Sequence, residues 1–136
     1  MKILCALLFI ATSLFADSLY VMANQNFVLE QLTAKQIKKI YLKHIDYIEG
    51  VAIYPLHLPA QDRARELFRK KILQMHTKEL KRYWTKAHYR GEQPPLVQNS
   101  QEAIFTFVRK FDGAIGYALL QKRPKNVKIL YKVDAQ

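Results

Sequence analysis

Cysteine is almost missing from this sequence. The single Cys5 lies inside an apolar, uncharged run over residues 3–15, which ends at the small residue Ala16. This run falls short of the ~20 residues that cross a bilayer, so we predict a secretory signal peptide over residues 1–16 and one domain over residues 17–136. A short uncleaved anchor is the alternative. Once the signal peptide is removed, no cysteine remains for a disulfide, a thiol nucleophile or a cysteine metal site.

Acidic residues are scarce as well, since 11 aspartates and glutamates stand against 22 lysines and arginines and give a formal net charge of +11. Removal of residues 1–16 takes away only Lys2 and leaves a net charge of +10. Such an excess attracts nucleic acid, acidic lipid head groups and small phosphate-like ligands alike. A basic, solvated surface explains the same charge, so the charge alone does not select a partner.

Motifs for catalysis and metal binding are also missing. We find no nucleophile elbow, no Walker loop and no carboxylate pair with an evident partner, so we predict no enzyme and no catalytic residue. The histidines never stand at i, i+4 of one helix, and we predict no metal site and no cofactor. Basic and aromatic residues alternate over residues 81–90, but Tyr83 and Trp84 fall on an apolar helical stripe. This placement favours core packing over nucleic-acid binding.

The clearest local signal is a helix that begins after Thr33. Thr33 and Gln36 have the T-x-x-Q spacing of a capping box, in which each side chain binds the other residue's backbone amide. Ile37, Ile40 and Tyr41 follow at helical spacing and are expected to form the buried face. We therefore predict a well-defined helix whose lysines lie mostly outside that face.

Three further helices are predicted to begin at capping residues. These residues are Asp62, Thr77 and Ser100. The first two helices follow one another after a short break, and we expect both to pack on the sheet. The third is expected to bury Ile104, Phe107, Val108 and Phe111.

Strands are expected between these helices. Buried strands are predicted over residues 18–23, 51–58 and 114–120, a brief one over 96–98, and a half-exposed one over 127–133. A turn is predicted over residues 46–50. The mixed order of strands and helices predicts an α/β fold, a three-layer sheet with helices on both faces.

Four stretches together carry a family resemblance. They are LTAKQIKKIYLKHI over residues 32–45, RELFRKKIL after residue 64, the pair Tyr83 and Trp84, and DGAIGYAL over residues 112–119. In this order they resemble the periplasmic phosphate-binding proteins of ABC transporters, over almost the whole chain after the signal peptide. The resemblance implies one lobe of a type 2 periplasmic-binding-protein-like fold, a small single-lobe relative of the two-lobed proteins.

The same resemblance implies where an anion would bind. The family has a Ser-Gly-Thr-type loop before one helix, and the corresponding residues 59–62 contain neither a hydroxyl nor a glycine, while Asp62 would occupy the helix start. The candidate ligand-binding residues are Gln61, Arg63, Arg65, Arg90 and Ser100. Arginine forks suit phosphate, whereas solvent exposure of Arg63 and Arg65 and simple capping by Ser100 are the alternative readings.

Two functions follow as expectations. The first is a periplasmic or secreted module that binds a small anion such as phosphate, or assists ABC-type uptake. The second is a ligand-free interaction domain of an envelope complex or sensor system, which residues 59–62 favour. A homodimer that supplies a second binding face lies between the two. No membrane span is expected after signal cleavage.

Overall fold

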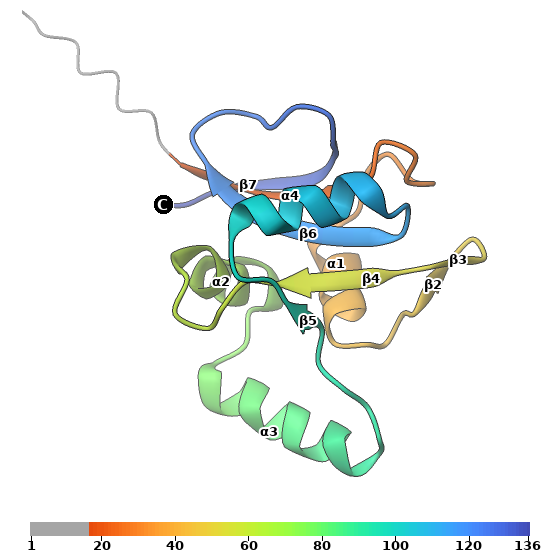
Figure 1. Cartoon of the computed structure of the whole chain (residues 1–136). Helices are drawn as coiled ribbons and strands as arrows, with labels where there is room; N and C mark the ends of the chain where they lie inside the picture. Colours follow the sequence, from red (N-terminus) through yellow and green to blue (C-terminus); the bar gives the residue numbers. More distant parts are fainter. Residues whose placement is uncertain (1–16) are drawn as a thin grey trace, which may run out of the picture.

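The computed structural model describes residues 17–136, so the predicted signal peptide over residues 1–16 lies outside the described part (Figure 1). The strands are β1 (Ser18–Ala23), β2 (Tyr47–Ile48), β3 (Val51–Ala52), β4 (Tyr54–His57), β5 (Leu96–Val97), β6 (Ala114–Leu120) and β7 (Lys128–Asp134). The helices are α1 (Ala34–Tyr41), α2 (Arg63–Phe68), the π-helix η1 (Arg69–Leu73), α3 (Thr77–Tyr89) and α4 (Gln101–Lys110). No helix of residues 17–136 is long and apolar enough to span a membrane.

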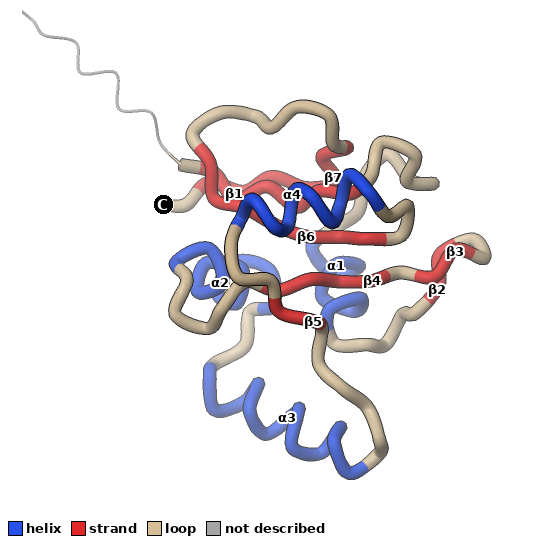
Figure 2. The backbone as a smooth tube through the Cα atoms, in the orientation of Figure 1, coloured by secondary structure: helices blue, strands red, loops and turns tan. Residues whose placement is uncertain are grey.

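Five strands form one mixed sheet in the order β5-β4-β6-β1-β7 (Figure 2). β4 runs parallel to β5 and β6, whereas β1 is antiparallel to β6 and to β7 on its other side. The carboxyl ends of β4, β5 and β6 therefore lie at one edge of the sheet. In open α/β sheets, ligands tend to bind outside this edge.

Neighbouring residues of β6 show that helices cover both faces of the sheet. A Cβ at Gly116 would collide with Ile104, so this face lies directly against α4. The next side chain, Tyr117, stacks on Phe68 of α2 with ring centroids 4.2 Å apart. Because successive strand residues point to opposite faces, α4 and α2 lie on opposite sides. The predicted three-layer α/β fold is confirmed.

Helix α1 forms as its local chemistry predicts. The Gln36 amide donates to the Thr33 hydroxyl at 3.1 Å, and the Thr33 amide donates to the Gln36 side chain at 2.8 Å. Ile37, Ile40 and Tyr41 are buried. The capping box and the buried face are both confirmed.

The predicted strand over residues 51–58 is divided in two. Its first part, β3, pairs with β2 in a hairpin, so the predicted turn over residues 46–50 contains a strand as well. Glu49 and Gly50 both have positive φ, 48° and 80°, the conformation that a tight hairpin turn requires. Val51 and Tyr54 are exposed, and burial on both faces holds only from Pro55 onward.

Helix α3 is the element that departs most from expectation. It stands away from the sheet, and Ala87 is its only fully buried residue (Figure 1). Thr77 is its first residue rather than its cap, since His76 occupies the N-cap position without a side-chain hydrogen bond. Leu80, Tyr83 and Trp84 are half-buried, and Tyr83 contacts the Leu42 carbonyl at the end of α1 rather than the sheet.

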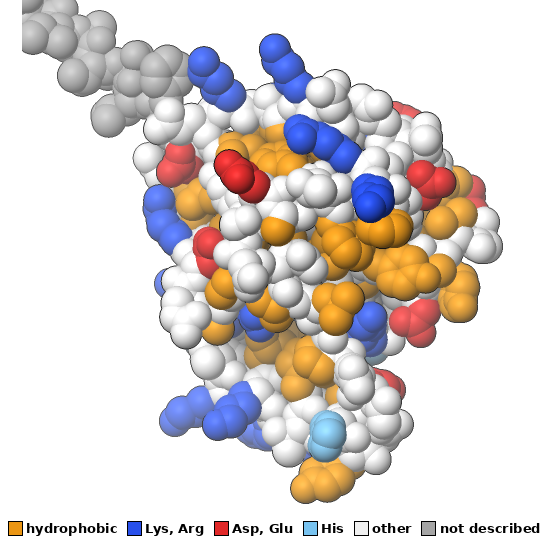
Figure 3. Space-filling model, in the orientation of Figure 1, with side chains coloured by type: hydrophobic (Ala, Val, Ile, Leu, Met, Phe, Trp, Pro, Cys, Tyr) orange, Lys and Arg blue, Asp and Glu red, His pale blue; other side chains and the backbone are white. Residues whose placement is uncertain are grey.

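The edge strand β5 remains exposed because α3 does not cover it. Figure 3 shows hydrophobic side chains clustered on the surface of this face of the molecule, below the position of α4 in Figure 1. Large exposed apolar side chains include Tyr54, Leu96, Val97 and Phe111. Phe111, expected on the buried face of α4, is 44% exposed because the helix ends one residue before it.

Candidate functional site

A pocket of about 130 Å³ lies at the carboxyl end of β4, beside α2 and the first turn of α3. It is lined by His57, Ala60, Arg65, Glu66, Phe68, Arg69, Leu73, Thr77 and Leu80. A water molecule occupies about 30 Å³ of liquid, so the pocket has room for about four oxygen-sized groups. That is the size class of a tetrahedral oxyanion.

His57 closes the end of β4 and is only 5% exposed. Its Nδ1 lies 2.8 Å from the Tyr117 hydroxyl, and the Leu58 amide donates to the same hydroxyl at 3.2 Å. Nδ1 of His57 is the one acceptor within hydrogen-bond distance of the Tyr117 proton among residues 17–136, so we assign that proton to the bond with Nδ1. Nδ1 is therefore an acceptor, and the imidazole proton resides on Nε2.

The Nε2–H group of His57 is a donor without a protein partner. It makes no hydrogen bond within residues 17–136. Every buried side-chain nitrogen or oxygen in this part of the chain has a hydrogen-bond partner, so the unpaired Nε2 must be accessible to solvent. Nε2 is therefore reached from the pocket that His57 lines. An oriented donor that faces a pocket and has no protein partner can donate to an anion or to another polar ligand atom.

The pKa of His57 is lowered from 6.5 to about 3, first by burial and second by the positive charge of Arg65. The imidazole is thus neutral near pH 7 and offers a hydrogen bond rather than a charge. Burial also raises the pKa of Tyr117 far above its usual range, so its hydroxyl stays protonated. Both protonation states agree with the assigned hydrogen bonds.

Two arginines supply the positive charge of the pocket. Arg65 Nη1 donates to the Leu58 carbonyl at 2.9 Å, which anchors the guanidinium at the end of β4. Arg69 donates to the Met75 carbonyl at 2.7 Å and to the Glu66 carboxylate at 2.9 Å. An arginine has five N–H donors, so each keeps several donors without a protein acceptor among the described residues. Hydrogen bonds and charge from Arg69 lower the pKa of Glu66, which stays ionised.

An aromatic cluster fixes the wall of the pocket. Phe68 stacks on Tyr117, meets His57 edge-on at 5.6 Å and lies 4.5 Å from Tyr41 between ring centroids. The Tyr41 hydroxyl donates to the Leu56 carbonyl at 2.9 Å. Close packing of these rings leaves the imidazole little freedom to turn, so its Nε2–H is held in one direction.

The structure brings together only part of the residues predicted from sequence. Arg65 lines the pocket, whereas Arg63 points to solvent and pairs with Asp17 at 3.4 Å. Gln61 is exposed in the turn before α2. Ser100 accepts the Ala103 amide at 3.1 Å and thereby caps α4.

Arg90 is not brought to this pocket. It follows the last residue of α3, pairs with Glu92 at 3.4 Å, and is exposed. Thr77 at the other end of α3 lines the pocket, and 13 helical residues span about 20 Å. The length of α3 therefore separates Arg90 from the other candidates.

Sequence reasoning missed Arg69 and Tyr117. Arg69 follows Arg65 by four residues, a spacing that places both on one helix face and could have revealed it. Tyr117 is 60 residues from His57 in sequence, and only the pairing of β4 with β6 brings the two together. No local pattern indicates that contact.

No family model and no curated protein sequence matches the chain. Solved structures do match. One is described as a phosphate ABC transporter substrate-binding protein with bound phosphate from Clostridium perfringens, with TM-score 0.68 and 19% identity over 85% of this chain and 45% of that one. An ABC-type phosphate transport receptor from Vibrio cholerae gives TM-score 0.65 and 20% identity over 85% and 46%. PstS from Borrelia burgdorferi gives 0.63 and 14% over 85% and 47%.

This chain thus spans less than half the length of the solved structures that it matches. At sequence identities of 14–20%, the similarity to these structures shows the fold alone. The resemblance seen in the sequence is confirmed at that level, together with the extent expected of a single-lobe relative. The chain has the fold of the phosphate ABC transporter substrate-binding proteins, over about half of their length.

Proposed function

We propose that this protein binds a small oxyanion, phosphate in the first instance, in the pocket formed by His57, Arg65 and Arg69. It acts as a ligand-binding or accessory module in ABC-type anion uptake, in the periplasm once the predicted signal peptide is removed. The likeness to phosphate-binding proteins supports the ligand class, since the proteins of that fold named above are described as phosphate binders or transport receptors.

One observation carries the proposal, namely the oriented Nε2–H of His57, which has no partner among residues 17–136 and borders a pocket with two arginines. A neutral histidine can donate one hydrogen bond to an oxyanion without first taking up a proton. Arginine forks add charge-assisted bonds of shorter length and greater strength. With a single carboxylate, Glu66, already bound to Arg69, the pocket keeps a net positive charge.

The pocket also bears on the alternative function. The Nε2–H of His57 opens to a pocket that also holds Arg65 and Arg69, an arrangement suited to binding an anion. The ligand-free interaction domain is therefore not favoured. Of the residues named from sequence, Arg65 belongs to the proposed site. Gln61, Arg63 and Ser100 lie at the same sheet edge but outside the pocket, and they have no part in the proposed site.

Thermal unfolding of the purified chain, with and without phosphate at constant ionic strength, tests the proposal. Saturation to 100 times Kd adds about 2.7 kcal/mol to the free energy of unfolding, which corresponds to roughly 10 °C in Tm for a domain of this size. Sulfate and a nucleotide serve as comparison anions. Arg65→Gln should abolish the shift, while Arg63→Gln, two residues earlier on the same helix, should leave it intact.

Two results would contradict the proposal. One is an unchanged Tm at millimolar phosphate with sulfate and nucleotide equally without effect. The other is a shift that Arg63→Gln removes and Arg65→Gln does not, which would place the anion at the exposed start of α2 instead of the pocket. A shift common to all anions and both variants would indicate general charge screening.

A further inference from the structure

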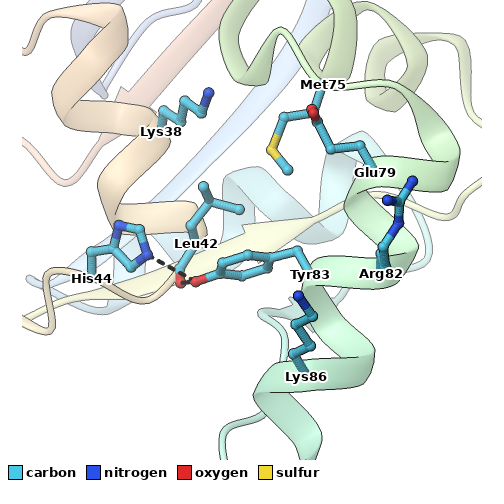
Figure 4. Close-up of a pocket in the computed structure, with 8 residues that line it drawn as sticks. All are labelled: Lys38, Leu42, His44, Met75, Glu79, Arg82, Tyr83 and Lys86. Carbon is cyan, nitrogen blue, oxygen red and sulfur yellow. Dashed lines mark hydrogen bonds between the residues drawn. The ribbon is translucent and has the colours of Figure 1, made fainter.

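A second, larger hollow lies on the other side of α3. It is a groove of about 470 Å³ between α1 and α3, and it shares no lining residue with the pocket of His57. Its floor is apolar, formed by Leu42 after α1, Met75 before α3 and the ring of Tyr83 (Figure 4). Small-molecule sites are commonly clefts of about 300–1,000 Å³ with mainly apolar walls and few polar groups.

Three cations line the groove without any acidic partner. They are Lys38 from α1 and Arg82 and Lys86 from α3, and none of them forms an ion pair within residues 17–136. The one carboxylate in the lining, Glu79, is likewise unpaired there. Figure 4 shows Lys86 reaching toward Tyr83, while Glu79 points toward Met75 at the other end of the groove. The Lys86 end therefore carries the positive potential.

A polar pair fixes the side of the groove opposite Lys86. The Tyr83 hydroxyl donates to the Leu42 carbonyl, and it lies 3.0 Å from Nε2 of His44. Since the hydroxyl proton is already used, Nε2 of His44 donates to the Tyr83 oxygen. This contact ties α3 to the end of α1, so the groove has a fixed width although α3 stands away from the sheet.

We propose that this groove binds an organic anion with an apolar body and a single anionic head group. The head lies near Lys86 and Arg82, and the body covers Leu42, Met75 and the Tyr83 ring. Burial of an apolar body against this floor supplies the driving force, and the unpaired cations select the sign of the head. A second copy of this chain is a poor occupant, because both copies carry a large positive charge.

Fluorescence titration with 8-anilinonaphthalene-1-sulfonate, an apolar sulfonate, tests this site, with decanoate as a competitor of different shape. Lys86→Glu and Arg82→Glu, at the proposed position of the head group, should each raise Kd about tenfold, since attraction becomes repulsion at short range. Lys78→Glu is the matched control, because Lys78 is exposed on the same helix and does not line the groove. It should change Kd less than about twofold. Circular dichroism and Tm verify that each variant is folded.

Inorganic phosphate separates this site from the proposed oxyanion pocket. Saturating phosphate should leave dye binding unchanged, and Arg65→Gln should do the same, so the two sites succeed or fail independently. An equal loss of affinity in Lys78→Glu would reduce the effect to overall charge and overturn the proposal. Absence of dye binding, or failure of decanoate to displace the dye, would overturn it as well.

Discussion

Replacement of Tyr117 by phenylalanine tests the hydrogen-bond arrangement on which the oxyanion pocket depends. The hydroxyl is the only acceptor found for the buried Leu58 amide and the only donor found for Nδ1 of His57 within residues 17–136. Its removal leaves two buried polar groups without a partner, at about 1–3 kcal/mol each. The stacking of the ring on Phe68 is retained, so we expect a loss of roughly 2–6 kcal/mol in the free energy of unfolding.

Urea unfolding at pH 7 measures this loss through the midpoint, with an unchanged m-value showing that the folded state remains compact. Tyr131→Phe is the matched control. Tyr131 lies half-buried in the same sheet, and its hydroxyl makes no hydrogen bond in the described part of the chain. We expect a change within about 0.5 kcal/mol for it. Equal effects of the two substitutions would refute the assigned role of Tyr117, and with it the fixed proton on Nε2 of His57.

Three further predictions concern other features. The free energy of unfolding should fall by about 2 kcal/mol from pH 6.5 to pH 5, because His57 is protonated in the unfolded chain over this range but stays neutral in the folded chain, where its pKa is about 3. Urea unfolding of His57→Gln should not show this dependence on pH, and an equal dependence in the variant would contradict the prediction. Gly116→Ala should cost about 1–3 kcal/mol through collision with Ile104, and less in an Ile104→Ala background; additive losses in a double-mutant cycle would disprove the contact. Thr33→Ala should cost about 1 kcal/mol in thermal unfolding by removing the α1 cap, and no loss would exclude a net contribution of the capping box.

Features of short range in sequence were predictable. The capping box at Thr33 and the cap at Ser100 each involve residues three apart, so the local pattern contains all the chemistry required. The strands β1 and β6 are largely apolar runs, which is why their extents were predicted correctly. The fold class follows from the order of such elements.

Features that depend on distant partners were not predictable. The stripe of α3 shows that one face is apolar, but not that this face meets the end of α1 instead of the sheet. The same holds for the pocket, where His57 acquires its role only when Tyr117 is placed beside it. Residues 59–62 lack the family's hydroxyls and glycine, and the donor of the pocket is instead His57, the last residue of the preceding strand β4.

The position of β1 has a consequence for how this chain folds. β1 is the first described element, yet it pairs only with the last two strands, with Ser18 opposite both Leu120 and Asp134. β1 therefore has no partner until residues 114–120, which form β6, have been synthesised. Such long-range pairing slows folding, so the newly made chain should persist in an unfolded form during synthesis. Loss of even the final few residues would leave an edge of β1 unpaired, and we expect such truncated chains to aggregate.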